Sequence, residues 1–219
     1  MPLALDAPPP PALYHVEARV GFNASGFTQG PGGIVLSWVS WWGLYGALDL
    51  GVYRLGPATL TVGASGWYNR PLLLEAVATW LTSTALEGTW DFDLVDKGAS
   101  ARVGVSFRHE SLFQPFVVLG VGRDSMHMGF SYEGNAGRGS GALQQKGLLL
   151  APGGGFELVG KSGFVFGVEL DYRIFRTFVT SEQLNVETTG GQPLIAVDKS
   201  EWQIPPRGFS WIVSAGWRF

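Results

Sequence analysis

Apolar and polar residues alternate along the last stretch of the chain, from Phe209 to Phe219. Because successive side chains of a β-strand point to opposite faces, this alternation predicts a strand with two different faces. One face carries Phe209, Trp211, Val213, Ala215, Trp217 and Phe219, and the other carries Ser210, Ile212, Ser214, Gly216 and Arg218. An apolar face with aromatic rings at both ends suits a lipid bilayer, and a small polar face suits the inside of a closed barrel.

The same alternation recurs upstream and predicts seven further strands. Their approximate ranges are 14–23, 34–54, 60–65, 101–108, 116–122, 148–159 and 164–174. In the second of them, Tyr45, Asp49 and Tyr53 are expected on the inner face. The predicted fold is therefore all-β, an up-and-down antiparallel barrel of eight strands that spans a membrane.

The connections between these strands fall into two kinds that alternate along the chain. Those near residues 55–58, 110–114 and 160–163 are short, whereas those near 24–33, 69–96, 132–146 and 180–208 are long. Outer-membrane barrels combine short periplasmic turns with long extracellular loops. The alternation therefore predicts that both termini lie in the periplasm.

The second long connection has its own pattern. Arg70 and Pro71 precede apolar residues at helix-like spacing as far as Leu81, which predicts a short helix in the second outer loop. The alternative is an extra hairpin, which would give ten strands. Upstream of the barrel, residues 1–13 form a Pro-rich lead, because Pro8 to Pro11 cannot join a ladder, and the barrel domain covers 14–219. The first residues lack the charged and apolar regions of an intact signal peptide, and are either the remnant of one or an artificial start.

Two stretches resemble a known family. The final strand, through Trp211, Val213, Ala215, Trp217 and Phe219, resembles the terminal strand that the barrel-assembly machinery recognises in bacterial outer-membrane proteins. The segment from Gln114 to Gly122 resembles a strand common in OmpA-like small barrels. The resemblance implies a monomer in the bacterial outer membrane. It also implies three partners: outer-membrane lipid, lipopolysaccharide and, during biogenesis, the assembly machinery.

Composition narrows the class of protein further. Without a run of 18 apolar residues a membrane protein of this sequence has to be a barrel, and the mean hydropathy of +0.15 agrees with strands that are polar on one face. The absence of cysteine removes disulfides and thiolate metal sites, and a net charge of −3 makes nucleic acid an unexpected partner. A soluble lipocalin-like barrel, with the apolar faces turned inward, is the structural alternative.

Charged residues gather on the predicted inner faces. An eight-stranded barrel has room inside only for its own side chains, and charges withdrawn from water require partners. The sequence therefore predicts an interior ion-pair network that fills the barrel. Its members are Glu17, Arg19, Asp49, Arg102, Arg108, Glu157, Glu169, Asp171, Arg173 and Arg218.

No catalytic, cofactor or metal site is predicted. His109-Glu110-Ser111 and Ser125-Met126-His127 place a histidine two residues from a serine, the spacing of lipid A deacylases of barrel fold, but the first lies at an expected periplasmic turn and the second has the reverse order. We therefore expect a non-enzymatic protein that acts in envelope structure or in surface interaction through its extracellular loops. The alternatives are a narrow channel for small or hydrophobic solutes, as in OmpW-like barrels, and a lipid A-modifying enzyme.

Overall fold

A computed structural model of the chain describes residues 15–27, 41–70, 88–107, 111–134, 137–188 and 207–219. These residues form eight antiparallel strands, and they contain no helix long and apolar enough to cross a membrane. The strands are β1 (His15–Phe27), β2 (Trp41–Leu55), β3 (Ala58–Arg70), β4 (Gly88–Phe107), β5 (Phe113–Gly134), β6 (Gly137–Val159), β7 (Phe164–Thr188) and β8 (Arg207–Arg218).

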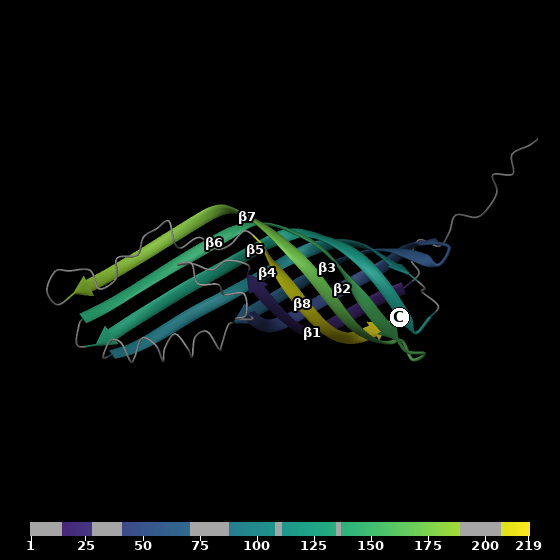
Figure 1. The fold of residues 1–219 in the computed structure, drawn as a ribbon, viewed down its shortest axis with the longest axis horizontal. Helices are drawn as coiled ribbons and strands as arrows, with labels where there is room; N and C mark the ends of the chain where they lie inside the picture. Colours follow the sequence, from purple (N-terminus) through teal and green to yellow (C-terminus); the bar gives the residue numbers. More distant parts are fainter. Residues whose placement is uncertain (1–14, 28–40, 71–87, 108–110, 135–136, 189–206) are drawn as a thin grey trace, which may run out of the picture.

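Each strand pairs with its neighbours in sequence, and β8 pairs back with β1, so the sheet closes into a barrel (Figure 1). The closing seam runs from Glu17 opposite Arg218 to Phe27 opposite Gly208. The predicted up-and-down barrel of eight strands is confirmed, and the ten-stranded alternative is wrong. The predicted helix falls on residues 71–87 and the lead on residues 1–13, both outside the described residues, so these two remain predictions.

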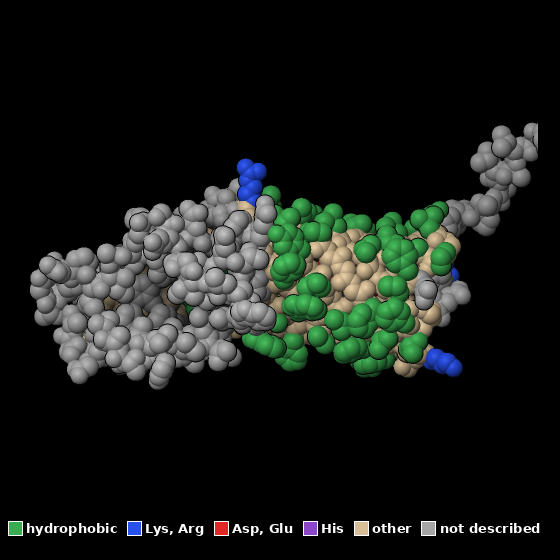
Figure 2. All heavy atoms as spheres, viewed as in Figure 1, with side chains coloured by type: hydrophobic (Ala, Val, Ile, Leu, Met, Phe, Trp, Pro, Cys, Tyr) green, Lys and Arg blue, Asp and Glu red, His purple; other side chains and the backbone are tan. Residues whose placement is uncertain are grey.

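The outside of the barrel is apolar and the inside is polar. Val103, Leu119 and Val213 are 53%, 44% and 45% exposed, whereas Arg102 and Glu169 are 5% and 2% exposed. Figure 2 shows apolar side chains spread over the outer wall of the barrel. The alternative of a soluble barrel with an apolar interior is therefore wrong, and the distribution is the one that a bilayer around the barrel requires.

Four strands are much longer than a bilayer requires. A membrane-spanning strand needs roughly 9–11 residues, and β4, β5, β6 and β7 have 20, 22, 23 and 25. They extend as one sheet beyond the end of the barrel formed by the shorter strands (Figure 1). Parts of the predicted connections 69–96, 132–146 and 180–208 are thus strand, a correction to the sequence prediction.

The second strand also differs from the prediction. Described pairing begins at Trp41 and not at Ile34, which lies outside the described residues. Near its other end the register shifts between Gly51 and Tyr53, so a β-bulge reverses the facing of the residues that follow. Tyr53 is consequently 43% exposed, and its predicted inward position is wrong.

Two tight turns close the end of the barrel that carries the short connections. Gly56, between β2 and β3, has a φ of 57°, and Gly163, between β6 and β7, has a φ of 82°. Other residues rarely adopt this left-handed conformation, which explains glycine at both positions. The C-terminal end of β8 lies at this same end of the barrel (Figure 1).

Candidate functional site: the barrel interior

The lowest layer of the interior is built around two arginines from the closing seam. Arg19 of β1 contacts Glu17 at 3.0 Å, Asp49 at 2.6 Å and Glu157 at 3.1 Å. Arg218 of β8 contacts Glu17 at 2.6 Å and Glu157 at 2.7 Å. Gln114 accepts a further hydrogen bond from Arg218 at 2.6 Å. Five strands thus contribute to one charged cluster that crosses the whole width of the barrel.

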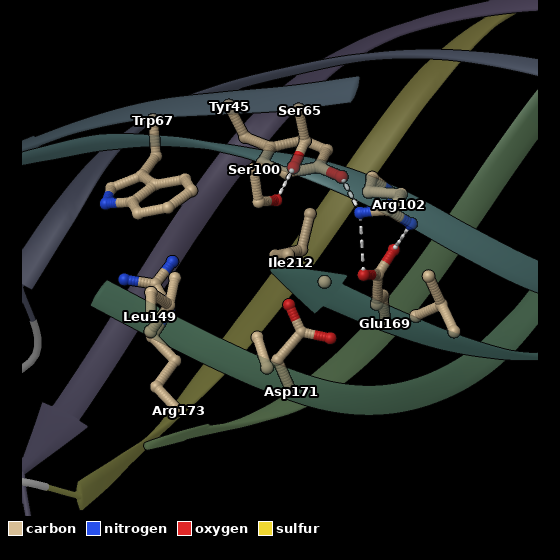
Figure 3. A pocket seen from close by; sticks show the side chains of 13 residues that line it. Tyr45, Ser65, Trp67, Ser100, Arg102, Leu149, Glu169, Asp171, Arg173 and Ile212 are labelled. Carbon is tan, nitrogen blue, oxygen red and sulfur yellow. Dashed lines mark hydrogen bonds and ion pairs between the residues drawn. The ribbon is translucent and has the colours of Figure 1, made fainter. Parts of the chain in front are cut away.

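The central layer is a bidentate ion pair between Arg102 and Glu169. The guanidinium of Arg102 donates to both carboxylate oxygens of Glu169 at 2.9 Å, and it also donates to the hydroxyl of Tyr45 (Figure 3). The Nε of Arg102 lies 3.6 Å from Asp49, which connects this layer to the one below. A bidentate arginine–carboxylate pair fixes both side chains in orientation, so the layer is rigid as well as filled.

The upper layer combines an aromatic ring with a weaker ion pair. Arg173 lies over the ring of Trp67, 4.5 Å from the ring centroid (Figure 3). Its Nη1 is 3.5 Å from Asp96. Asn69 donates a hydrogen bond to the same carboxylate at 2.8 Å. Asp124 belongs to the same layer. It follows Arg123 on β5, and Arg123 faces outward at the edge of the apolar wall. Its burial, followed by the charge of Asp96, raises the pKa of Asp124 well above its usual value.

Glycine makes room for the acidic side chains. A Cβ at Gly63 would lie 2.2 Å from Oδ1 of Asp49 and 2.3 Å from the backbone oxygen of Leu48. A Cβ at Gly153 would lie 2.0 Å from Oδ1 of Asp171. The inward glycines of the sequence therefore hold space that the carboxylates occupy.

Little empty space is left between these side chains. A cavity of about 10 Å³ lies between the central and upper layers, bordered by Tyr45, Arg102 and Asp171 (Figure 3). A second cavity of about 20 Å³ lies in the lowest layer, bordered by His15, Arg19 and Arg218. Each is close to the minimum that one water molecule occupies. The described interior is therefore a plug and not an open pore at these levels.

The structure places nine of the ten predicted network residues, and Arg108 lies outside the described residues. Eight of the nine are buried and Arg218 is partly buried. Asp171 lines the cavity beside Glu169, but among the described residues no cation lies within 4.0 Å of it. The other eight all take part in ion pairs, those of the lowest and central layers with one another and Arg173 with Asp96.

Sequence reasoning missed the acidic residues of the upper layer. Asp96 belongs to the predicted connection 69–96, and Asp124 follows the predicted strand 116–122, so the facing of neither residue was considered. The alternation itself held the signal, because counting back in steps of two from Arg102 leads to Ser100, Gly98 and Asp96. The alternation is hard to recognise before Asp96, because Leu94 is apolar although it faces inward and Asp93 is polar although it faces outward.

The predicted assembly residues and the Ser/His pair lie on the outer wall. Trp211, Val213 and Trp217 are exposed and Ala215 is half-buried, all on the outward face of β8, and Phe219, directly after this strand, is also exposed. Ser125 and His127 share the outward face of β5 without a hydrogen bond between them. The Nε2 of His127 instead lies 3.7 Å from Asp93. The other pair is only partly described, since His109 and Glu110 lie outside the described residues. No group of three metal-ligating side chains occurs in the described part of the chain.

Comparison with known proteins shows similarity at the level of fold. No protein-family model matches the chain, and no curated protein matches it significantly. The crystal structure of a major outer membrane protein from Thermus thermophilus superposes with a TM-score of 0.57 at 13% identity, over 93% of this chain and 99% of the other. Ail, the attachment invasion locus protein of Yersinia pestis, gives a TM-score of 0.47 at 14% identity, over 94% and 98% of the two chains. Neisserial surface protein A gives 0.42 at 15% identity, over 93% and 94%. With its closed ring of strands and its match to the Thermus protein, the chain has the fold of a bacterial outer-membrane β-barrel, here with eight strands.

Proposed function

We propose that this protein is a plugged barrel of the bacterial outer membrane, acting at the cell surface through the sheet that extends from β4 to β7. Both termini and the short turns then lie in the periplasm. The observation that carries the proposal is the combination of a filled, ion-paired interior with four strands about twice as long as a bilayer requires. A conducting protein needs an open interior, whereas a surface-interaction protein needs structure outside the membrane.

The extending sheet has two lateral edges, formed by β4 and β7. Pairing of β4 with β3 stops at Asp96 opposite Asn69, and pairing of β7 with β8 stops at Ile174 opposite Arg207. Beyond these points β4 pairs with β5 and β7 pairs with β6, up to Gly88 and Thr188. Within the described residues, the sheet therefore ends in two edge strands. Such edges can accept an additional strand from a partner protein.

Shortening the central hairpin tests the proposal. Ser131 pairs with Ser140, so removing residues 131–140 shortens β5 and β6 equally and leaves the register of the barrel intact. We expect the shortened protein to reach the outer membrane and fold, as judged by its heat-dependent migration on gels. Cells that display it should lose adhesion to immobilised host or bacterial surface proteins that the full chain supports. Adhesion equal to that of the full chain would contradict a role for the sheet.

The channel alternative makes a different prediction. In planar bilayers the filled interior predicts no sustained discrete openings for the full chain. Substitution of Arg102 by Ala should introduce openings or leave the barrel unstable, because it removes the central side chain of the plug. Steady openings of the unaltered protein that disappear in the Arg102 variant would favour a narrow channel.

The remaining expectations belong to the same proposal. We propose a monomer that contacts outer-membrane lipid and lipopolysaccharide, that the assembly machinery inserts through the final strand, and that has no catalytic activity. No hydrogen bond joins Ser125 to His127, whose Nε2 lies 3.7 Å from Asp93, and this supports the last point, since a serine nucleophile needs its base within hydrogen-bond reach. Incubation of the protein with lipopolysaccharide, followed by mass spectrometry of lipid A, should show unchanged acyl chains.

A further inference from the structure

A row of outward-facing polar residues marks the upper border of the apolar wall on β4, β5 and β6. Lys97 lies opposite Ser125, and Ser125 lies opposite Lys146, so the three residues stand side by side across three strands. The strand spacing of about 4.8 Å puts the Cα atoms of the two lysines about 10 Å apart, with the serine hydroxyl between them. Arg123 lies two residues below Ser125 on the same outward face.

Within the described strands, the three cations of this row have no acidic partner. Lys97, Arg123 and Lys146 are exposed, and among the described residues no carboxylate lies within 4.0 Å of their charged groups. The acidic residue that faces outward nearby, Asp93, is already paired. It contacts Arg70 at 2.7 Å and lies 3.7 Å from His127. Asp124 also borders the groove, but its carboxyl interacts with Asp96 and Arg173 on the inward side of the sheet. The three outward cations therefore repel one another, and an anion bound between them would stabilise the arrangement.

A groove on the outer wall joins these charges to the apolar surface. It has a volume of about 900 Å³, and its border includes the three cations together with Tyr68, Ala99 and Leu148. Tyr68 and Leu148, at its border, are 44% and 46% exposed. Figure 2 shows Lys and Arg side chains at the borders of the apolar wall. The groove is thus polar on one side and apolar on the other, like the headgroup and acyl chains of a lipid.

We propose that this groove binds a phosphorylated glycolipid of the lipid A type, with its phosphate groups between Lys97, Arg123 and Lys146 and its acyl chains along Leu148 and Ala99. The inference rests on the proposed function, since the groove faces the outer leaflet only if the extending sheet is extracellular. Arginine binds phosphate through two parallel hydrogen bonds, lysine adds a point charge, and the hydroxyl of Ser125 can donate a further bond. Charge complementarity selects the phosphate, and the adjoining apolar wall selects a lipid over a free anion.

A binding measurement with two charge-matched variants tests the site. Purified protein in a zwitterionic detergent is titrated with bisphosphorylated lipid A, and bound lipid is counted by native mass spectrometry. The site variant is Arg123→Gln with Lys146→Gln, and the control is Arg138→Gln with Lys161→Gln, which removes the same charge from exposed positions outside the groove. We expect the site variant to lose about tenfold or more in affinity, the equivalent of one good charge-assisted contact, and the control to bind like the unaltered protein.

Further binding measurements identify which part of the lipid is recognised. Lipid A from which the phosphates have been removed should bind at least about tenfold more weakly, if phosphate is the recognised group. Equal loss in both variants, equal binding of the dephosphorylated lipid, or displacement of the lipid by millimolar inorganic diphosphate would each overturn the proposal. The protein lacking residues 131–140 should keep its lipid binding. If that protein loses adhesion but keeps lipid binding, the two roles are independent of each other. If it keeps both adhesion and lipid binding, the adhesive role of the sheet is contradicted and the lipid site is still supported.

Discussion

At the scale of single residues, the interior is stabilised by pairs that are costly to divide. Arg102 and Glu169 are both almost completely buried and share two hydrogen bonds of 2.9 Å. Removing one member of a buried ion pair leaves the other charge without compensation, and this costs more than the intact pair contributes.

Substitution of Glu169 by Gln should lower the free energy of unfolding by about 3–5 kcal/mol, because Arg102 loses its principal counter-charge. Urea titration of the protein in lipid vesicles measures the change. The matched control is Glu133→Gln, which removes an ion pair with Arg138 whose side chains are 66% and 74% exposed. An exposed pair is worth about 0–1 kcal/mol, so comparable losses in the two variants would show that the central pair is not energetically important.

Substitution of Gly63 by Ala should destabilise the barrel, because the new methyl group would lie 2.3 Å from the backbone oxygen of Leu48, which no rotamer change can move. A loss of about 1–3 kcal/mol is expected for overpacking of this kind. Gly66→Ala in the same strand is the control, since a Cβ there has an ordinary nearest contact of 3.5 Å. Thermal unfolding in detergent, followed by circular dichroism, should separate the two variants, and equal stability would contradict the close fit of Gly63.

At the scale of elements, one strand serves two environments. The outward face of β5 is apolar at Val117, Leu119 and Val121 and becomes polar from Arg123 onward. A bilayer requires apolar side chains on the outward face, so the change from apolar to polar at Arg123 marks where the bilayer ends on β5. It also explains why alternation predicted the lower half of the long strands and not their extensions, where buried apolar residues such as Leu94 and Met126 lie on the inward face instead.

Substitution of Leu119 by Arg should therefore destabilise the inserted barrel by about 2–4 kcal/mol, the cost of arginine near the middle of a bilayer. Ser131→Arg, on the same outward face of β5 within the extending sheet, should be nearly neutral. Refolding into vesicles of defined thickness, followed by tryptophan fluorescence, compares the variants. Equal stability of the two would place the bilayer border elsewhere on the strand.

At the scale of the whole molecule, the ring of strands and the facing of the central residues could be predicted from the sequence. The inward placement of Arg102 and Glu169 followed from strict alternation in strands that cross the apolar wall. The outward turn of Tyr53 could not be foreseen, because a bulge depends on how two strands pair and not on either strand alone. The contacts of Arg218 with Glu17 and Glu157 also required the closed barrel, since these residues come from strands far apart in the sequence.

The seam between β1 and β8 has a consequence for how the protein is made. Arg218 bonds Glu17 across a separation of 201 residues, and the same guanidinium neutralises Glu157. Contacts so distant in sequence form late, because the entropy of closing a long segment must be overcome first. Until then two open sheet edges and uncompensated carboxylates coexist in one chain, which favours aggregation over spontaneous insertion. Pairing of β8 with β1 closes the sheet edges and neutralises the carboxylates in one step. We therefore expect insertion of the barrel to become irreversible when the final strand pairs.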